Sequence, residues 1–313
     1  MELVNIKEIK EKCEKSKKTD QNEILGMVFE GGGVLGAAHI GSLSVLQSPC
    51  INIDIAKVKY FSGSSVGSII AALCACRLSI VDLKNALDEI KFAKLLDNDF
   101  GVIRDIQRLW KNFGYHKGDQ LETSFASVLV KYIGNSDITL KEVYEKYGSF
   151  LIIPVTEIFK SYCKTKYFTP ESDPDEKLST VVRYSCSYPF MFIAKNNYSD
   201  GGILDNYPIK KLSEYVPLKT ILGFKFKSNK DLTERPSNVI EFAASIISGL
   251  RKKGANLTQE ELDRTIIINT DKYKSMDFKI TEKDKNVIYQ YGIMATYEFF
   301  INKNPGKIDR INY

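Results

Sequence analysis

The sequence predicts an α/β protein, a three-layer α/β/α domain built on a mostly parallel central sheet. Two observations carry this prediction. Apolar runs typical of buried strands alternate with helical patterns along the chain, and two glycine-rich turns, at 31–36 and 63–67, each follow such a run and precede a helix. Parallel strands need a helical crossover, so a repeated strand–turn–helix order indicates parallel βαβ units.

The remaining elements follow in order. Residues 69–76 are apolar nearly all round, which predicts a buried helix, and residues 80–135 read as a helical insertion or cap. We expect a catalytic domain over 23–313, preceded by a charged helix or tail at 1–22. Strands are expected at 24–29, 58–61, 151–155, 221–226 and 265–269, and later helices at 181–188, about 239–250 and about 285–300.

Aromatic side chains are frequent in the predicted insertion, at Phe92, Phe100, Trp110, Phe113 and Tyr115. Core packing is their ordinary use. A cap over the active site or a lipid-facing rim is the alternative interpretation.

Composition narrows the function classes. The chain has 313 residues, 43% of them hydrophobic, and a net charge of +5, which permits contact with an anionic membrane without requiring it. No basic block with interleaved aromatics indicates nucleic-acid binding. Six scattered cysteines and two histidines predict reduced thiols and no metal site. Lacking an apolar leader or a run of about 18 apolar residues, the sequence predicts a cytoplasmic protein with no signal peptide or transmembrane helix.

The second glycine-rich turn has the spacing of a nucleophile elbow. Ser65 lies between Gly63 and Gly67 in the order Gly-x-Ser-x-Gly, and Ser64 cannot occupy the central position. The nucleophile of such a turn sits in a strained conformation that large neighbours would block. A helix follows at once, so its free N–H groups point toward the serine. Ser65 is therefore the candidate nucleophile.

The first glycine-rich turn permits two interpretations. Its free N–H groups could hold an oxyanion beside Ser65. Alternatively, Gly31, Gly33 and Gly36 satisfy the Gly-x-Gly-x-x-Gly pattern of a dinucleotide site, and Asp54 lies 18 residues farther on, near the position of a ribose-binding acid. That alternative, a dinucleotide-binding oxidoreductase, explains neither the serine elbow nor the Asp-Gly-Gly sequence discussed next.

The chain is poor in the usual base for a serine nucleophile. Of its two histidines, His39 falls in the helix after the first turn and is expected to be structural, and no histidine follows His116. Asp200, followed by Gly201 and Gly202, offers a carboxylate on a tight turn, which could accept a serine proton if burial raises its pKa. An Asx-turn without chemistry is the alternative.

The three motifs together, in this order, resemble the patatin-like phospholipase family. They are the Gly-Gly-Gly loop at 31–36, the elbow at 63–67 and the Asp-Gly-Gly at 200–202, and the similarity extends over about 24–300. Further matches lie at 151–157, at 185–192, at Asn206 and at Pro208.

This resemblance implies a patatin-like fold and a lipid acyl hydrolase that works through a Ser–Asp dyad, without a cofactor. Ser65 would be the nucleophile of an acyl-enzyme mechanism, and Asp200 the base. The expected partners are a phospholipid or lysophospholipid and, transiently, the membrane that contains it; a protein activator is left open. The implied oxyanion hole comprises Gly31, Gly32, Gly33 and Val66, with turn support from Gly36, Gly63, Gly67, Gly201 and Gly202.

One position departs from the family pattern. The family loop usually carries Arg or Lys where this chain has Leu35. Loss of one electrostatic contact at such a site can cost on the order of 3 kcal/mol in the barrier. The departure motivates a second hypothesis, a catalytically impaired lipid-binding protein on the same scaffold.

Overall fold

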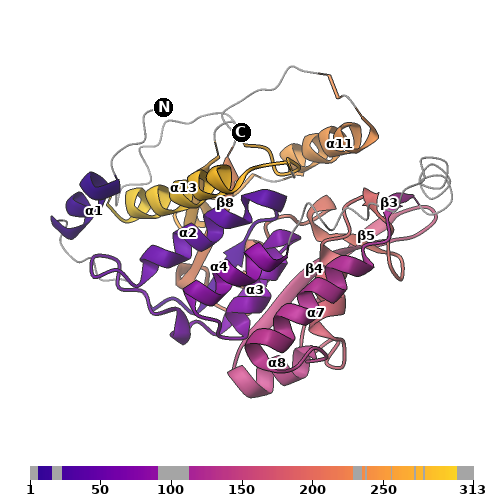
Figure 1. The fold of residues 1–313 in the computed structure, drawn as a ribbon, viewed down its shortest axis with the longest axis horizontal. Coiled ribbons are helices and arrows are strands. Elements are labelled where there is room, and N and C mark those ends of the chain that lie inside the picture. The colour runs from indigo at the N-terminus through magenta and orange to yellow at the C-terminus, as the bar shows by residue number, and fades with distance from the viewer. Residues whose placement is uncertain are drawn as a thin grey trace.

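The computed structural model describes residues 6–15, 23–90, 113–227, 235–236, 238–254, 256–270, 273–277 and 279–301. Within these ranges the chain folds around one seven-stranded sheet with the order β5-β4-β2-β1-β8-β9, and β7 also pairs with β4 (Figure 1). The strands of this sheet are β1 (Gly26–Phe29), β2 (Tyr60–Gly63), β4 (Phe150–Ile158), β5 (Cys163–Phe168), β7 (Tyr198–Asp200), β8 (Ile221–Lys227) and β9 (Thr265–Asn269).

The core of the sheet is parallel. Strands β4, β2, β1, β8 and β9 pair in parallel, whereas β5 and β7 run antiparallel to β4. The α-helices are α1 (Ile6–Lys15), α2 (Gly36–Leu46), α3 (Val66–Ala75), α4 (Ile80–Glu89), α7 (Asp119–Ile133), α8 (Leu140–Tyr147), α9 (Leu178–Ser185), α10 (Ile209–Ser213), α11 (Val239–Gly254), α12 (Gln259–Leu262) and α13 (Glu282–Ile301). The predicted α/β class with a mostly parallel sheet is confirmed.

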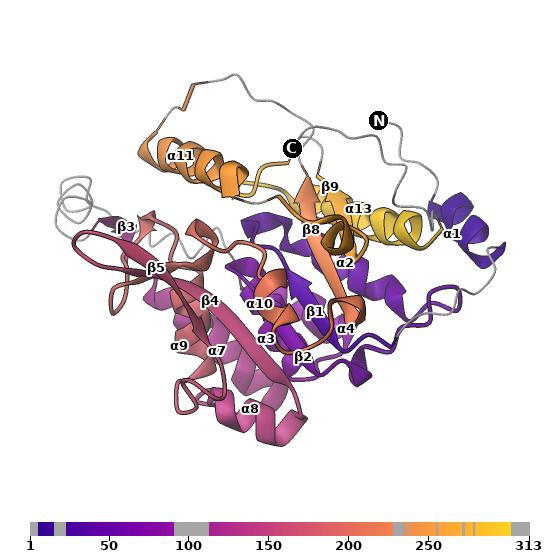
Figure 2. The ribbon, with the colours of Figure 1, turned by 180° about the vertical axis from the view of Figure 1, so that it is seen from behind.

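The two faces of the sheet are covered unequally. Side chains alternate between faces along a strand, so Met27 and Phe29 of β1 join the larger hydrophobic cluster, while Val28 joins the smaller. The larger cluster includes residues of α2, α3 and α13; the smaller one includes Ile209 and Leu212 of α10 (Figure 2). Helix α3 is buried along its whole length, as its apolar sequence predicts.

Strand β4 pairs with two different strands along one edge. Its first residues pair with β2, through Ser62 opposite Ile152, and its later residues pair with β7, through Asp200 opposite Val155. Because β2 and β7 run in opposite directions along β4, the C-terminal end of each strand points toward the C-terminal end of the other. Ile152 and Val155 are three positions apart on β4, about 10 Å at the rise of a strand.

The predicted insertion at 80–135 is not uniformly helical. It contains α4 and α7, but also the short strand β3 (Gly114–His116), which pairs with β6 (Phe190–Phe192) in a separate two-stranded sheet. Phe113 is exposed, and Phe92, Phe100 and Trp110 lie outside the described residues. In the predicted N-terminal segment, α1 buries Ile9 and packs on α13.

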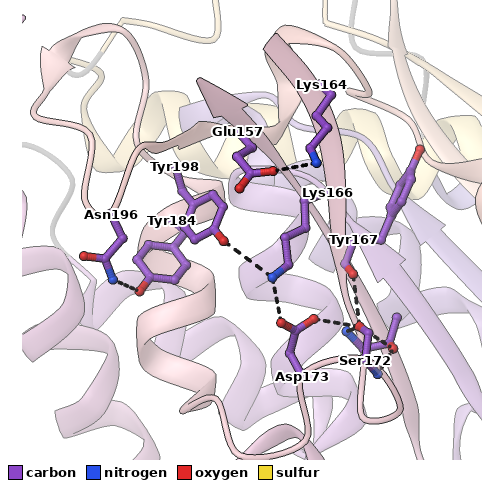
Figure 3. A network of polar contacts seen from close by, with 10 residues as sticks. Glu157, Lys164, Lys166, Tyr167, Ser172, Asp173, Tyr184, Asn196 and Tyr198 are labelled. Carbon is purple, nitrogen blue, oxygen red and sulfur yellow. Dashed lines mark hydrogen bonds and ion pairs between the residues drawn. The ribbon is translucent and has the colours of Figure 1, made fainter. Parts of the chain in front are cut away.

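Polar side chains fasten the antiparallel part of the sheet. Lys166 of β5 lies 2.7 Å from Asp173, whose other oxygen accepts the Ser172 hydroxyl, and Glu157 of β4 pairs with Lys164 at 3.2 Å (Figure 3). The Glu157–Lys164 pair cross-links β4 and β5, whereas the Lys166–Asp173 pair ties β5 to the loop that follows it. Among the described helices, none combines the length and apolar character needed to cross a bilayer.

Helices α2 and α13 pack backbone to backbone. A Cβ on Gly292 would overlap the carbonyl oxygen of Ala38, and one on Gly41 would overlap that of Tyr289. The Ser42 hydroxyl donates to the Gly292 carbonyl at 3.1 Å. Glycine is therefore required sterically at both crossing points.

Replacing Gly292 with alanine should lower the free energy of unfolding by about 1–3 kcal/mol, because the added methyl forces the two helices apart. Gly249 of α11 is the matched control, since a Cβ there meets nothing within 4 Å. Gly249→Ala should stabilise by up to about 1 kcal/mol through helix propensity. Urea denaturation of both variants is the measurement, and equal effects would contradict the packing argument.

Candidate active site

The elbow holds Ser65 in a strained conformation. Its φ of 51° and ψ of −127° are unusual for a residue with a side chain, and α3 begins at the next residue. A Cβ on Gly63 would overlap the Gly67 carbonyl, and one on Gly67 would overlap that of Phe29. The two glycines thus permit the tight turn that lifts Ser65 out of the buried residues around it.

The glycine loop lies directly against the elbow. A Cβ built on Gly31 would stand 3.1 Å from the Cβ of Ser65 and 2.9 Å from the Ser64 carbonyl oxygen. Asn206 holds the loop from the other side: its side-chain N–H donates to the Gly31 carbonyl at 3.0 Å, and its backbone carbonyl accepts the Gly31 N–H at 3.1 Å. Gly31 is therefore a structural position whose N–H is already used.

The next two N–H groups of the loop are differently situated. Among the described residues, Gly32 and Gly33 donate to no protein acceptor. Gly33 has a φ of 51°, and a Cβ there would overlap the Ser275 carbonyl, which also accepts the Val34 N–H at 3.1 Å. The loop is thus fixed on both sides while these two donors stay available.

A buried acid anchors the start of the loop. Glu30 forms an ion pair with Lys225 of β8 and accepts the Phe226 N–H at 2.6 Å. Its own carbonyl is 2.8 Å from Nε2 of His39. Charge-assisted bonds of this kind are stronger than neutral ones, so they hold the loop against β8.

Asp200 ends β7 and is 1% exposed. Its backbone carbonyl accepts the Thr156 hydroxyl at 2.9 Å, and Oδ1 accepts the Gly202 N–H at 2.7 Å. The Asx-turn considered as an alternative is thus present, and it occupies Oδ1. A Cβ on Gly201 would stand 2.9 Å from the Ser64 hydroxyl oxygen, so the Asp-Gly-Gly turn packs against the elbow.

The end of α9 connects the elbow to the aspartate. The Ser185 hydroxyl accepts the Ser65 N–H at 3.1 Å and donates to the Pro154 carbonyl at 2.8 Å. Two residues later, the Ser187 carbonyl accepts the Asp200 N–H at 2.9 Å. One short segment therefore fixes the backbones of both candidate catalytic residues.

The buried thiol of Cys186 lies between these two contacts. Burial, with a further contribution from the charge of Asp200, raises the pKa of this thiol to about 12. Its sulfur is 3.9 Å from the Ser68 hydroxyl and also contacts the Ser65 side chain. The thiol therefore stays protonated at neutral pH.

Arg183 also holds the segment from Ser185 to Ser187 in place. This buried guanidinium donates to the Ser187 hydroxyl and to the carbonyls of Lys117 and Ile193. Its fixed fork of donors ties α9 to β3 and to the strand end after β6.

His39 and Asp54, the histidine and the acid noted in the sequence, have structural surroundings that do not suit catalysis or ribose binding. His39 is fully buried, and that burial lowers its pKa to about 4, so it is a neutral packing residue, as expected. Asp54 precedes β2, at the amino edge of the sheet, and its carboxylate accepts the Ala56 N–H. A ribose-binding acid belongs at the carboxyl edge, so the dinucleotide interpretation is wrong.

Leu35 is buried. It lies at the junction of a 3₁₀ turn and α2 and belongs to the hydrophobic core. Arginine at this position would bury a charge among apolar side chains, which is costly. The leucine is thus a packing residue in this chain.

Sequence reasoning did not identify Ser185, Ser187 or Arg183 as site residues. Their sequence signals are the family match at 185–192, which includes Ser185 and Ser187, and the spacing of Arg183 and Ser187, one helical turn apart. Ser185 bonds to Ser65, 120 positions away, and Arg183 bonds to Lys117, 66 positions away, and no local pattern reveals such contacts.

Comparison with known proteins agrees with this geometry. The family model of patatin-like phospholipases matches residues 27–213, more than half of the chain, and spans all three motifs. The chain belongs to the patatin-like phospholipase family. It is accordingly a hydrolase.

The chain is similar to proteins of viruses, bacteria and fungi. Protein R571 of Acanthamoeba polyphaga mimivirus is 27% identical over 299 residues, covering 91% of this chain and 96% of R571. "Probable lipid hydrolase 463L" of Invertebrate iridescent virus 6 is 27% identical, covering 84% and 91%. The crystal structure of VipD from Legionella pneumophila shares the fold with a TM-score of 0.60 at 20% identity, covering 89% of this chain and 67% of VipD.

Acidification should destabilise the protein through His39. The pKa of this imidazole is near 6.5 in the unfolded chain and about 4 in the fold, so the unfolded state binds the additional proton. The contribution of neutral His39 to the free energy of unfolding is full above pH 6.5 and is lost as the pH falls toward 4. Between pH 7 and pH 5 the loss amounts to about 2 kcal/mol. Urea unfolding at both values, compared with His39→Gln, measures it; an unchanged pH dependence in the variant would refute the assignment.

Proposed function

We propose that the protein hydrolyses fatty-acyl esters of phospholipids or lysophospholipids through a Ser65–Asp200 dyad. The observation that carries this proposal is the shared edge of β4, where β2 leads into the Ser65 elbow and β7 ends at Asp200. The Ser185–Ser187 segment, which bonds to both backbones, supports it. No histidine is needed in this scheme.

The proposed reaction has two halves. Ser65 Oγ attacks the ester carbonyl carbon while its proton passes to the Asp200 carboxylate. The tetrahedral intermediate collapses, the C–O bond to the lipid alcohol breaks, and Asp200 returns the proton to that leaving oxygen. Asp200 then takes a proton from water as the water attacks the acyl-enzyme, and the fatty acid departs as Ser65 regains its proton.

The negative charge on the carbonyl oxygen needs fixed donors. The available N–H groups of Gly32 and Gly33 are suited to this, because the loop is clamped before the substrate arrives. The N–H of Val66, at the start of α3, is a third donor of the same kind. Gly31 supports this oxyanion hole through its bond to Asn206 and supplies no donor.

The substrate class rests on the family and on the relatives. The family is that of patatin-like phospholipases, and the name of the iridescent-virus relative describes a lipid hydrolase. We infer that the acyl donor is a membrane lipid.

Ser65→Ala and Asp200→Asn should each lower fatty-acid release from phospholipid vesicles by at least about a thousandfold, because each removes one half of the dyad. Ser65→Ala should also abolish covalent labelling by a fluorophosphonate. Ser127→Ala on α7 is the matched control, because that exposed serine donates to the Thr123 carbonyl of its own helix.

The outcomes separate the two hypotheses. Full activity of Ser65→Ala would overturn the dyad. A folded wild type that neither labels nor releases fatty acid, but binds vesicles, would favour the lipid-binding protein on the same scaffold.

Ser185→Ala should lower kcat by roughly ten- to a hundredfold with little change in KM, because the part-buried N–H of Ser65 loses its acceptor. The fluorophosphonate labelling rate of the folded protein should fall by the same factor. Ser179→Ala, on the same helix, is the control for general loss of stability, monitored by thermal unfolding. A parallel loss of stability with an unchanged labelling rate would show that Ser185 is only structural.

A further inference from the structure

The hairpin between β4 and β5 has an unusual composition for an exposed tip. Every residue from Ile158 to Lys164 is exposed, in the sequence Ile-Phe-Lys-Ser-Tyr-Cys-Lys. Tyr162 is 58% exposed and Phe159 is 37% exposed. Aromatic and basic side chains without an acid are the composition found at membrane–water interfaces.

The tip is built rigidly. The rings of Phe159 and Tyr162 stack with centroids 4.7 Å apart, and the Phe159 N–H donates to the Tyr162 carbonyl at 2.9 Å. Lys164 lies over the Phe159 ring at 5.4 Å. The same lysine pairs with Glu157 at the base of the tip (Figure 3). A preformed aromatic pair loses little conformational entropy when it inserts into another phase.

The tip projects from the same edge of the sheet as the proposed active site. β4 runs parallel to β2, so both strands finish at the same end of the sheet. Ile158 is the last residue of β4, and Gly63 is the last residue of β2 and leads into the elbow. Helix α11 lies at that end as well, packed against β6 (Figures 1 and 2).

Helix α11 adds a second apolar surface at this edge. It buries Ala243 and Ile247, whereas Phe242 is 57% exposed and Ile246 is 49% exposed, one turn apart. Its sequence ends in Arg251-Lys252-Lys253. Exposed apolar residues on a helix whose sequence is basic at its end are typical of helices that bind at a membrane surface.

We propose that the hairpin tip at 158–164, together with Phe242 and Ile246 of α11, is a docking surface for an anionic lipid bilayer. The proposal rests on the proposed function, since docking on this edge brings Ser65 to the lipid that it would cleave. Phe159, Tyr162 and Phe242 enter the interface, and Lys160 and Lys164 face the anionic headgroups.

The test compares vesicle binding by two matched variants. Tyr144 on α8 is also 49% exposed, but α8 leads into the start of β4, at the opposite end of the sheet. Phe159→Ser/Tyr162→Ser should lower the partition onto vesicles containing one third phosphatidylserine by about tenfold. Tyr144→Ser should leave it unchanged. Lys160→Glu should weaken binding to these vesicles and have little effect on pure phosphatidylcholine.

Hydrolysis of a soluble short-chain ester separates docking from chemistry. The hairpin variant should keep wild-type turnover of this ester and lose activity only on vesicles. Equal vesicle binding by wild type, hairpin variant and Tyr144→Ser would overturn the docking surface. Absence of ester turnover in the wild type, with the expected binding differences intact, would contradict the proposed function and leave the docking surface standing.

Discussion

Strand β4 is the constraint on which the candidate site depends. A β-strand offers one line of backbone groups on each edge, and β4 divides one of its edges between β2 and β7. The hydrogen-bond register fixes the positions of β2 and β7 along β4. The positions of Ser65 and Asp200, which follow and end these strands, are therefore set by main-chain pairing. Pro154, the residue before Val155 on β4, accepts the Ser185 hydroxyl and so ties α9 to the same strand.

Close backbone contact around this strand explains the glycines. The elbow packs on the carbonyl of Phe29, and the Asp-Gly-Gly turn packs on that of Pro154, where no side chain fits. Buried groups complete the support: Glu30 with Lys225 behind the glycine loop, and Arg183 behind Ser187. The strained φ of Ser65 is sustained because several independent contacts determine its surroundings.

Much of the parallel core could be predicted from the sequence. The apolar runs ending at Phe29 and Phe61 predict β1 and β2, and the expected strand at 265–269 coincides with β9. Strands β5 and β7 escaped prediction, because Cys163–Phe168 alternates weakly and Tyr198–Asp200 has only three residues. Both obtain their hydrogen bonds from β4, so their conformation is decided by a neighbour distant in sequence.

The sequence by itself determined the fold class, the family and the three motifs, because turn chemistry and apolar periodicity are local properties. Only the tertiary structure decided which loop N–H groups stay available, that Leu35 faces the core, and that Ser185 and Ser187 join the elbow to Asp200. Those features depend on contacts between segments far apart along the chain. Composition cannot encode such contacts, since each partner is an ordinary residue until the sheet brings the pair together.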